Sequence, residues 1–267
     1  MFCLGLQVVG EAAQVNDVPT LALLVDRWSK YVTLEPDDRD AILAIPFTRK
    51  TFGKDAYILR EGEQTTDCSL LLRGVAFRQK LLRNGSRQII SFHVPGEFVD
   101  LQNNLLGVSD HNVQAFEGTE AAIIPGAALA RLAAEREAVR LAMWTDTLVD
   151  ASVFREWVVN VGRRSSRARI AHLLCELALR LRQASTSDGE RLDFPVTQEQ
   201  IADATGLTAV HTNRTLQTLR QDGLIQLTGR SLTVLDWKRL RETAEFDDLY
   251  LHQHPAATAP APSRQIF

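Results

Sequence analysis

The chain has 267 residues, which is long for one hydrophobic core and suits two domains. Its hydrophobic content of 45% and charged content of 24% are typical of a soluble globular protein. The net charge of −3 gives no overall basic field, so any contact with nucleic acid has to come from a local basic patch.

Three cysteines, Cys3, Cys68 and Cys175, lie far apart and form no C-x-x-C pair. This spacing argues against a disulfide framework or a thiolate metal cluster, and we expect reduced thiols in a cytoplasmic protein. No apolar run approaches the roughly 18 residues that span a bilayer. The first residues lack a positively charged region, so we expect no signal peptide. Residues 1–27 are expected to form an N-terminal extension, and residues 251–267, rich in Pro and Ala, a disordered tail.

Six glycines recur in the first half of the chain, first 12 residues apart and then 11 apart four times. They are Gly62, Gly74, Gly85, Gly96, Gly107 and Gly118. Short apolar or alternating runs lie between them, at 69–72, 75–77, 88–92, 113–116 and 121–124. Short strands with turn glycines at this spacing are typical of an antiparallel sandwich or barrel. We therefore predict an antiparallel β-roll over about 45–127, in a domain of residues 28–134, with Asn84-Gly85 as a type I′ hairpin turn.

A helical pattern follows, because neither Pro nor Gly interrupts residues 127–161. Two apolar stripes run along this segment. The first contains Leu141, Trp144, Leu148, Ala151 and Val158 and is interrupted by Arg155, and the second contains Val149, Val153 and Trp157. One stripe can pack on the chain's own roll, which leaves the other to pair with a second copy. Residues 135–164 are therefore expected to be a dimerisation helix and hinge. The alternative is that one chain buries both stripes.

The hinge that begins at Gly162 is basic. It carries Arg163, Arg164, Arg167 and Arg169, with no acidic residue between Glu156 and Glu176. A solvated hinge face and a set of phosphate contacts are both open interpretations. A further helix is expected over about 168–183, followed by a polar loop at 184–191.

The segment from Thr197 to Val234 has the layout of a winged helix-turn-helix. Thr197 and Gln200 fit a capping box at the start of a first helix, and Gly206 fits the turn. Thr208 can cap a second helix that ends before Gly223. Ile201, Ala202, Leu207, Leu216 and Leu219 are expected to point inward, as are Thr212 and Thr215 if their hydroxyls bond back to the preceding turn. Residues 224–227 and 231–234 are expected to form the wing of a DNA-binding domain that spans 165–250.

The outward face of the second helix carries side chains that can read bases. Arginine can donate to guanine O6 and N7, and asparagine or glutamine can pair with adenine. Residues 195–241 hold six Lys or Arg against four Asp or Glu, which makes this region mildly basic. The expected contacts to double-stranded DNA are Thr197, Thr208, His211, Asn213, Arg214, Gln217 and Arg230. The alternative is a winged helix that binds protein and never meets DNA.

The order of β-roll, long helix, helix-turn-helix and wing resembles the Crp/Fnr family of bacterial transcription regulators over about residues 28–250. The resemblance rests on Glu61-Gly62-Glu63 with Leu72-x-Gly74, on Arg87-x-Ile89 with Pro95-Gly96-Glu97-Phe98, and on the run from Thr197 through Gly223-Leu224-Ile225. It implies an α+β fold with a cyclic-nucleotide-binding-like roll, a homodimer on a two-fold symmetric promoter site, and contact with RNA polymerase. It also implies that Arg214 reads guanine. Two further base-contact positions of the family fall on Ala209 and Val210, so this chain is not expected to share the family's common half-site in full.

The sensor half departs further from the family pattern. The Gly-Glu pair of cyclic-nucleotide binders falls on Asp100-Leu101, and the Arg-Ser or Arg-Thr pair falls in Ser109-Asp110-His111-Asn112. An aspartate in place of the phosphate-binding arginine would repel a phosphate, so we expect no binding of cyclic AMP in the usual mode. Asp100, Leu101, His111 and Asn112 remain the candidate effector pocket, with no predicted cofactor and no metal.

A cupin-like metalloenzyme with an appended helical domain is the alternative from another functional class. That chemistry needs an H-x-H pair with a carboxylate and a further histidine. His93 and His111 stand 18 residues apart with no neighbouring histidine, and no catalytic motif occurs, so we expect no enzymatic activity.

Overall fold

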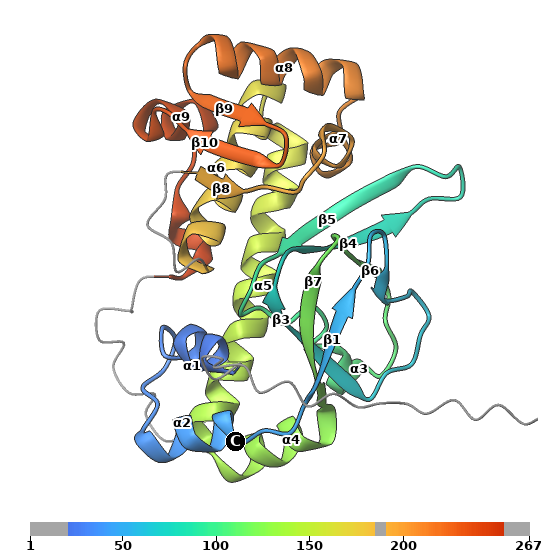
Figure 1. The fold of residues 1–267 in the computed structure, drawn as a ribbon, viewed down its shortest axis with the longest axis vertical. Helices are drawn as coiled ribbons and strands as arrows, with labels where there is room; N and C mark the ends of the chain where they lie inside the picture. The colour runs from blue at the N-terminus through green and yellow to red at the C-terminus, as the bar shows by residue number, and fades with distance from the viewer. Residues whose placement is uncertain (1–20, 185–190, 254–267) are drawn as a thin grey trace, which may run out of the picture.

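The computed structural model describes residues 21–184 and 191–253 (Figure 1). Cys3, residues 1–20 of the expected extension, residues 185–190 of the polar loop and residues 254–267 of the expected tail lie outside the described residues. In the part that is described, no helix is both long and apolar enough to cross a membrane.

A β-roll, a long connecting helix and a small winged domain follow one another along the chain, which confirms the predicted α+β architecture (Figure 1). The helices are α1 (Ala22–Trp28), α2 (Pro36–Leu43), α3 (Asn103–Leu106), α4 (Gly126–Glu135), α5 (Glu137–Arg163), α6 (Ser166–Ala184), α7 (Gln198–Thr205), α8 (Ala209–Gln221), α9 (Trp237–Ala244) and the 3-10 helix η1 (Asp248–Leu251). The strands are β1 (Thr48–Phe52), β2 (Tyr57–Leu59), β3 (Asp67–Arg73), β4 (Ala76–Leu81), β5 (Arg87–His93), β6 (Asn112–Ala115), β7 (Thr119–Pro125), β8 (Arg191–Asp193), β9 (Ile225–Thr228) and β10 (Ser231–Val234).

Two antiparallel sheets make the roll, in the strand orders β1-β7-β3 and β2-β6-β4-β5. Their inner faces meet in a small apolar core. Its buried members include Phe52, Leu71, Val99, Val113 and Ala121. Strands β1 and β2 carry no alternating apolar pattern, and the sequence did not reveal them.

All six regularly spaced glycines have positive φ, between 74° and 87°. The spacing therefore records where the chain turns, because side-chain-bearing residues adopt this backbone region at a cost. The predicted type I′ turn at Asn84-Gly85 is wrong, since only Gly85 has positive φ. Instead the Gly85 amide donates to the Leu82 carbonyl (2.9 Å), and the Leu82 amide donates to Ser86 (2.8 Å). This is a three-residue hairpin loop with its glycine in the left-handed region.

The helical segment after Pro125 is divided in two at Arg136, whose backbone is extended (φ −128°, ψ 109°). Neither Pro nor Gly occurs at this break, so the sequence pattern gave no sign that the helix is interrupted here. Helix α4 packs against the roll, and α5 then runs the length of the molecule to the winged domain (Figure 1).

The two stripes on α5 have opposite environments. Val149, Val153 and Trp157 are buried, whereas Trp144 is 58% exposed and Leu148 is 65% exposed. Leu141, Ala151 and Val158 of the same first stripe are also exposed. The alternative that one chain buries both stripes is therefore wrong.

Helix α1 crosses the boundary expected between residues 27 and 28. Leu24 and Trp28 are fully buried, and the Trp28 ring stacks on Phe98 at 6.2 Å between centroids. Since these side chains form part of the central core, residues 21–28 belong to the folded body. At the other end, Leu251 is also buried, although the expected tail begins there.

Candidate nucleic-acid interface and sensor cavity

The first helix of the helix-turn-helix begins at a capping box, as predicted. The Thr197 hydroxyl accepts from the Gln200 amide (3.2 Å), and the Gln200 side chain accepts from the Thr197 amide (2.8 Å). Gly206 ends α7 with φ 65°, and the Leu207 amide bonds back to the Ala202 carbonyl. These local bonds fix the tight turn into α8.

Helix α8 buries one face and exposes the other. Thr208 caps its start by accepting from the His211 amide (3.3 Å), and Gly223 follows its C-cap with φ 68°. Leu216 and Leu219 are fully buried, and Thr212 and Thr215 also point inward. The Thr212 hydroxyl finds no hydrogen-bond partner among the described residues, so the expected bond to the preceding turn is wrong for this threonine.

The exposed face of α8 holds the predicted base-reading side chains. Val210, His211, Arg214 and Gln217 are exposed, and Asn213 is half-buried. The Arg214 guanidinium has no hydrogen bond or ion pair to a described residue, and Arg214 lines a surface hollow of about 360 Å³. This arrangement leaves a cation free on a helix that lies at the surface of the molecule (Figure 1).

Two neighbours of Arg214 are held by other elements. The Asn213 Nδ2 donates to Oε1 of Gln198 at the start of α7 (2.7 Å). The His211 Nε2 lies 2.8 Å from Oγ of Ser166 at the start of α6. Asn213 therefore keeps one amide hydrogen and its side-chain carbonyl oxygen free for other partners. His211, in contrast, connects α8 to the start of α6 at the hinge.

The wing is a three-stranded sheet of order β8-β10-β9. Strand β8, which the sequence did not predict, pairs with β10 through Leu192 and Leu232. Arg230 lies exposed in the turn between β9 and β10, while its carbonyl accepts from the Phe194 amide (2.8 Å).

The four hinge arginines differ in their surroundings. Arg163 is exposed, and Arg167 makes a half-exposed ion pair with Asp222 at 2.6 Å. Arg164 is bound inside the protein to Glu156 (2.6 Å). Arg169 donates to the Thr205 carbonyl (2.7 Å). Phosphate contacts through Arg164 and Arg169 are therefore disfavoured in this conformation, because their guanidinium groups already hold the hinge together.

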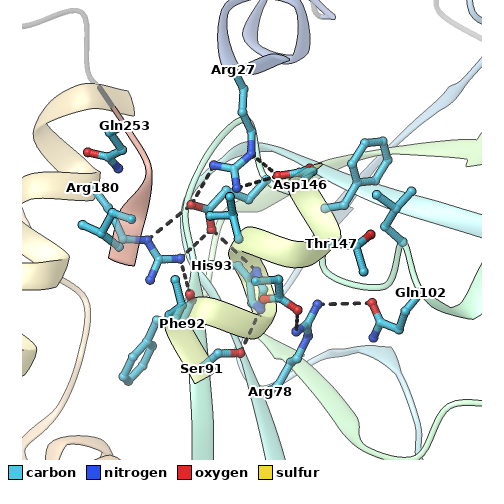
Figure 2. A pocket seen from close by; sticks show the side chains of 17 residues that line it. Arg27, Arg78, Ser91, Phe92, His93, Gln102, Asp146, Thr147, Arg180 and Gln253 are labelled. Carbon is cyan, nitrogen blue, oxygen red and sulfur yellow. Dashed lines mark hydrogen bonds and ion pairs between the residues drawn. The ribbon is translucent and has the colours of Figure 1, made fainter. Parts of the chain in front are cut away.

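A polar cavity lies where the roll, α1, α5 and α6 meet (Figure 2). Of the four expected effector residues, only Leu101 lines it. The buried Asp100 carboxylate accepts from the Ser69 amide (2.6 Å), and Asn112 accepts from the Glu61 amide (3.1 Å). The Asp110 side chain is 87% exposed, so its charge faces solvent and not the cavity.

The lining instead comes from residues that the sequence analysis missed. Arg78 on β4 donates to the Val99 carbonyl (3.0 Å) and binds Asp150 of α5 at 2.6 Å. His93 on β5 bonds to Ser91 (2.9 Å). Burial, together with Arg78 and Arg180, lowers the pKa of His93 well below its ordinary value. The available signal was the predicted hairpin at Asn84-Gly85, because strands paired across that turn bring Arg78 opposite Ser91. The empty space is about 40 Å³.

A buried ion network borders this cavity. Arg27 of α1 binds Asp146 of α5 (2.7 Å) and Glu97 (3.2 Å). Arg180 of α6 binds the same Glu97 (2.6 Å) and Glu176 (2.6 Å). Burial would raise the pKa of Glu97, but Arg180 and Arg27 hold it below its ordinary value. Burial raises the pKa of Asp146, against the opposing effect of Arg27.

No group of three or more His, Cys, Asp and Glu residues is placed to hold a metal ion within residues 21–184 and 191–253. His93 and His111 take protein partners, Ser91 and Asp110 respectively. These contacts do not favour the metalloenzyme alternative.

Comparisons with known proteins agree with this geometry. The model of the Crp-like helix-turn-helix domain matches residues 168–243, and that of the cyclic nucleotide-binding domain matches residues 49–136. The nitrogen fixation regulation protein FixK of Bradyrhizobium diazoefficiens is 29% identical over 199 residues, covering 73% of this chain and 81% of that protein. The transcriptional activator protein FnrL of Cereibacter sphaeroides is 27% identical over 199 residues, covering 71% and 77%.

Solved structures give the same fold. The structure of FixK2 from Bradyrhizobium japonicum superposes with a TM-score of 0.68 at 24% identity, covering 74% of this chain and 98% of that one. The CRP-family regulator TTHB099 from Thermus thermophilus superposes with a TM-score of 0.54 at 25% identity, covering 74% and 97%. With the roll, the long helix and the winged helix-turn-helix in the same order, this chain belongs to the Crp/Fnr family of DNA-binding transcription regulators.

Proposed function

We propose that this regulator binds a two-fold symmetric promoter site as a homodimer and reads guanine through Arg214. The observation that carries the proposal is the exposed Arg214 guanidinium, which has no partner among the described residues and lies on the outward face of α8. A helix of this kind can enter the major groove, where an arginine donates to both O6 and N7 of guanine.

The exposed stripe of α5 supports the homodimer. An apolar face that includes Trp144 and Leu148 is costly to leave in water, and a second copy would cover it by the same residues. Such a dimer carries two copies of α8, which matches a site with two half-sites.

The remaining contacts are proposed from the position of each side chain. Asn213 and Gln217 lie beside Arg214 and are the further base-reading candidates, with His211 limited by its bond to Ser166. Thr197, Thr208 and Arg230 lie at the ends of α7, α8 and the wing, where they can contact phosphates. In the hinge, Arg163 and Arg167 are the better phosphate candidates because they are accessible.

The chain is further proposed to act in the cytoplasm through binding alone, without catalysis, and to contact RNA polymerase. The support is that relatives carry names as transcriptional activators. Cyclic AMP is not proposed as the effector, because the cavity is small and Arg78, one of the cations that line it, is already paired with Asp150.

The test is binding of the purified full chain to sites selected from genomic DNA, measured at fixed salt. Arg214→Ala should weaken binding by about 5- to 150-fold for each half-site, the range of one bidentate arginine–guanine contact, and remove the preference at one base pair of each half-site. Arg239→Ala is the control, because Arg239 is an exposed arginine on α9 of the same domain. Unchanged binding by Arg214→Ala would refute the role given to Arg214. Binding to these sites that depends on added cyclic AMP would show that cyclic AMP is an effector and would refute the proposal on this point.

A further inference from the structure

Helix α1 lies outside both matched regions, yet its Arg27 extends into the polar cavity (Figure 2). The Nε of Arg27 donates to Asp146 at 2.8 Å, and its Nη1 donates to Oε1 of Glu97 at 3.2 Å. Asp146 and Glu97 are both nearly inaccessible to solvent. Arg27, whose side chain is 20% exposed, is therefore a mostly buried cation that binds two buried carboxylates, not a free surface residue of a terminal extension.

The partner that Arg27 shares with the winged domain is Glu97. Its Oε1 also accepts from Nε of Arg180 (3.3 Å), and its Oε2 accepts from Nη2 of Arg180 (2.6 Å). Arg180 stands near the end of α6, the helix that leads into the DNA-binding domain, and it also donates to the Phe92 carbonyl of β5 (2.6 Å). One carboxylate of the roll thus joins α1 to the winged domain.

A second contact between the two domains lies at α7. Arg87 of β5 binds Asp203 at 2.6 Å, and the Gln88 side chain donates to the Ala204 carbonyl at 3.5 Å. Neither contact involves the exposed face of α8, which lies on the other side of the winged domain from the roll (Figure 1). The roll therefore holds the domain without covering Arg214.

The charges in this network depend on one another. Arg27 is the only cation bound to Asp146 among the described residues, and the next polar neighbour, Nε1 of Trp28, is 3.5 Å away. Without Arg27, the buried Asp146 would lack a counter-ion, and Glu97 would keep Arg180 alone. Loss of Arg27 thus weakens both the contact between α1 and α5 and the contact between α1 and Glu97.

We propose that Arg27 is a positioning residue for DNA binding, which fixes the winged domain on the roll through Glu97 and Arg180. In a dimer, this fixes the distance between the two α8 helices and so the spacing of half-sites that the protein accepts. The inference rests on the proposed homodimer with α8 as the reading helix.

The experiment measures binding of the full chain to DNA with a single half-site and to DNA with two half-sites. The two half-sites are separated either by the spacing that the wild type binds most tightly, called the best spacing, or by two or four additional base pairs. Arg27→Met should bind the single half-site as the wild type does, but its preference for the best spacing should fall by about tenfold, since fewer molecules hold the competent geometry. Asp26→Ala is the control, because Asp26 is an exposed acid on the same helix.

A second variant distinguishes loss of the positioning role from loss of the fold. Arg27→Met with Asp146→Leu replaces the buried ion pair by apolar side chains, which folded proteins often tolerate. It should keep the wild-type melting temperature and still lose the spacing preference. An unchanged spacing preference in this variant would overturn the proposal, as would tighter binding to every site, which would make the contact inhibitory. Arg214→Ala in the same assay tests the proposed function separately, because it should weaken the half-site as well.

Discussion

Leu148→Asp tests the proposed dimer at the most exposed leucine of the α5 stripe. Burial of a whole leucine side chain is worth about 1.5–3 kcal/mol. Because 65% of Leu148 is exposed in one chain, covering it contributes about 1–2 kcal/mol per copy. Two-fold symmetry doubles this to about 2–4 kcal/mol, so the dimer dissociation constant should rise by about 30- to 700-fold. Burying the new carboxylate would add to that loss.

The assay is sedimentation velocity over a dilution series, with thermal unfolding measured in parallel. Leu249→Asp is the matched control, because Leu249 is 75% exposed on η1 and outside the stripe. The monomer fold should survive both changes, since neither leucine is buried. A Leu148→Asp protein that dimerises as tightly as the wild type would refute the reasoning. Equal dissociation by the Leu249→Asp control would refute it too.

Three further predictions concern local features of the structure. Gln198→Ala removes the acceptor that holds Asn213. If Asn213 reads an adenine, as proposed, the preference for adenine at the base pair it contacts should fall by about tenfold in competition binding, within the 1–3 kcal/mol that such a contact provides. Burial and the nearby Arg164 lower the pKa of His172 to about 3. Below about pH 6.5 the unfolded chain therefore binds a proton at His172 that the folded protein does not bind, so this histidine should lower stability by about 1.4 kcal/mol per unit as the pH drops towards 3. In denaturant titrations, His172→Gln should make the dependence of stability on pH shallower by that amount. Thr197→Ala removes the hydroxyl that accepts from the Gln200 amide in the capping box, which should cost about 1 kcal/mol and lower the melting temperature by about 2–4 °C.

Each of these three has an outcome that contradicts it. Gln198→Glu keeps an acceptor for Asn213, so it should restore the base preference, and failure to do so would remove the positioning role. If the stability of His172→Gln depends on pH as steeply as that of the wild type, the proton uptake belongs to another group and the prediction is contradicted. A Thr197→Ala protein as stable as the wild type would mean that water replaces the cap at no cost.

The sequence alone determined the features that depend on neighbours along the chain. Gly85 and Gly206 marked turns because positive φ favours glycine at single positions. Thr197 and Gln200 marked a helix start because both partners of the capping box lie within four residues. The order of these local signals was enough to identify the roll, the helix-turn-helix and the family. Arg214 was placed on the outward face by helical period alone.

Only the tertiary structure decided what depends on partners far apart in the chain. It selected which α5 stripe is buried, because that choice depends on where α6 and the roll pack against it. It also placed a polar cavity beside Arg78 and brought Arg27, Glu97 and Arg180 together across sequence separations of 70 and 83 residues. Charged residues normally occupy the surface, so no local pattern marks the few that are buried. Their place in the interior is fixed by a counter-ion that folding alone brings into reach.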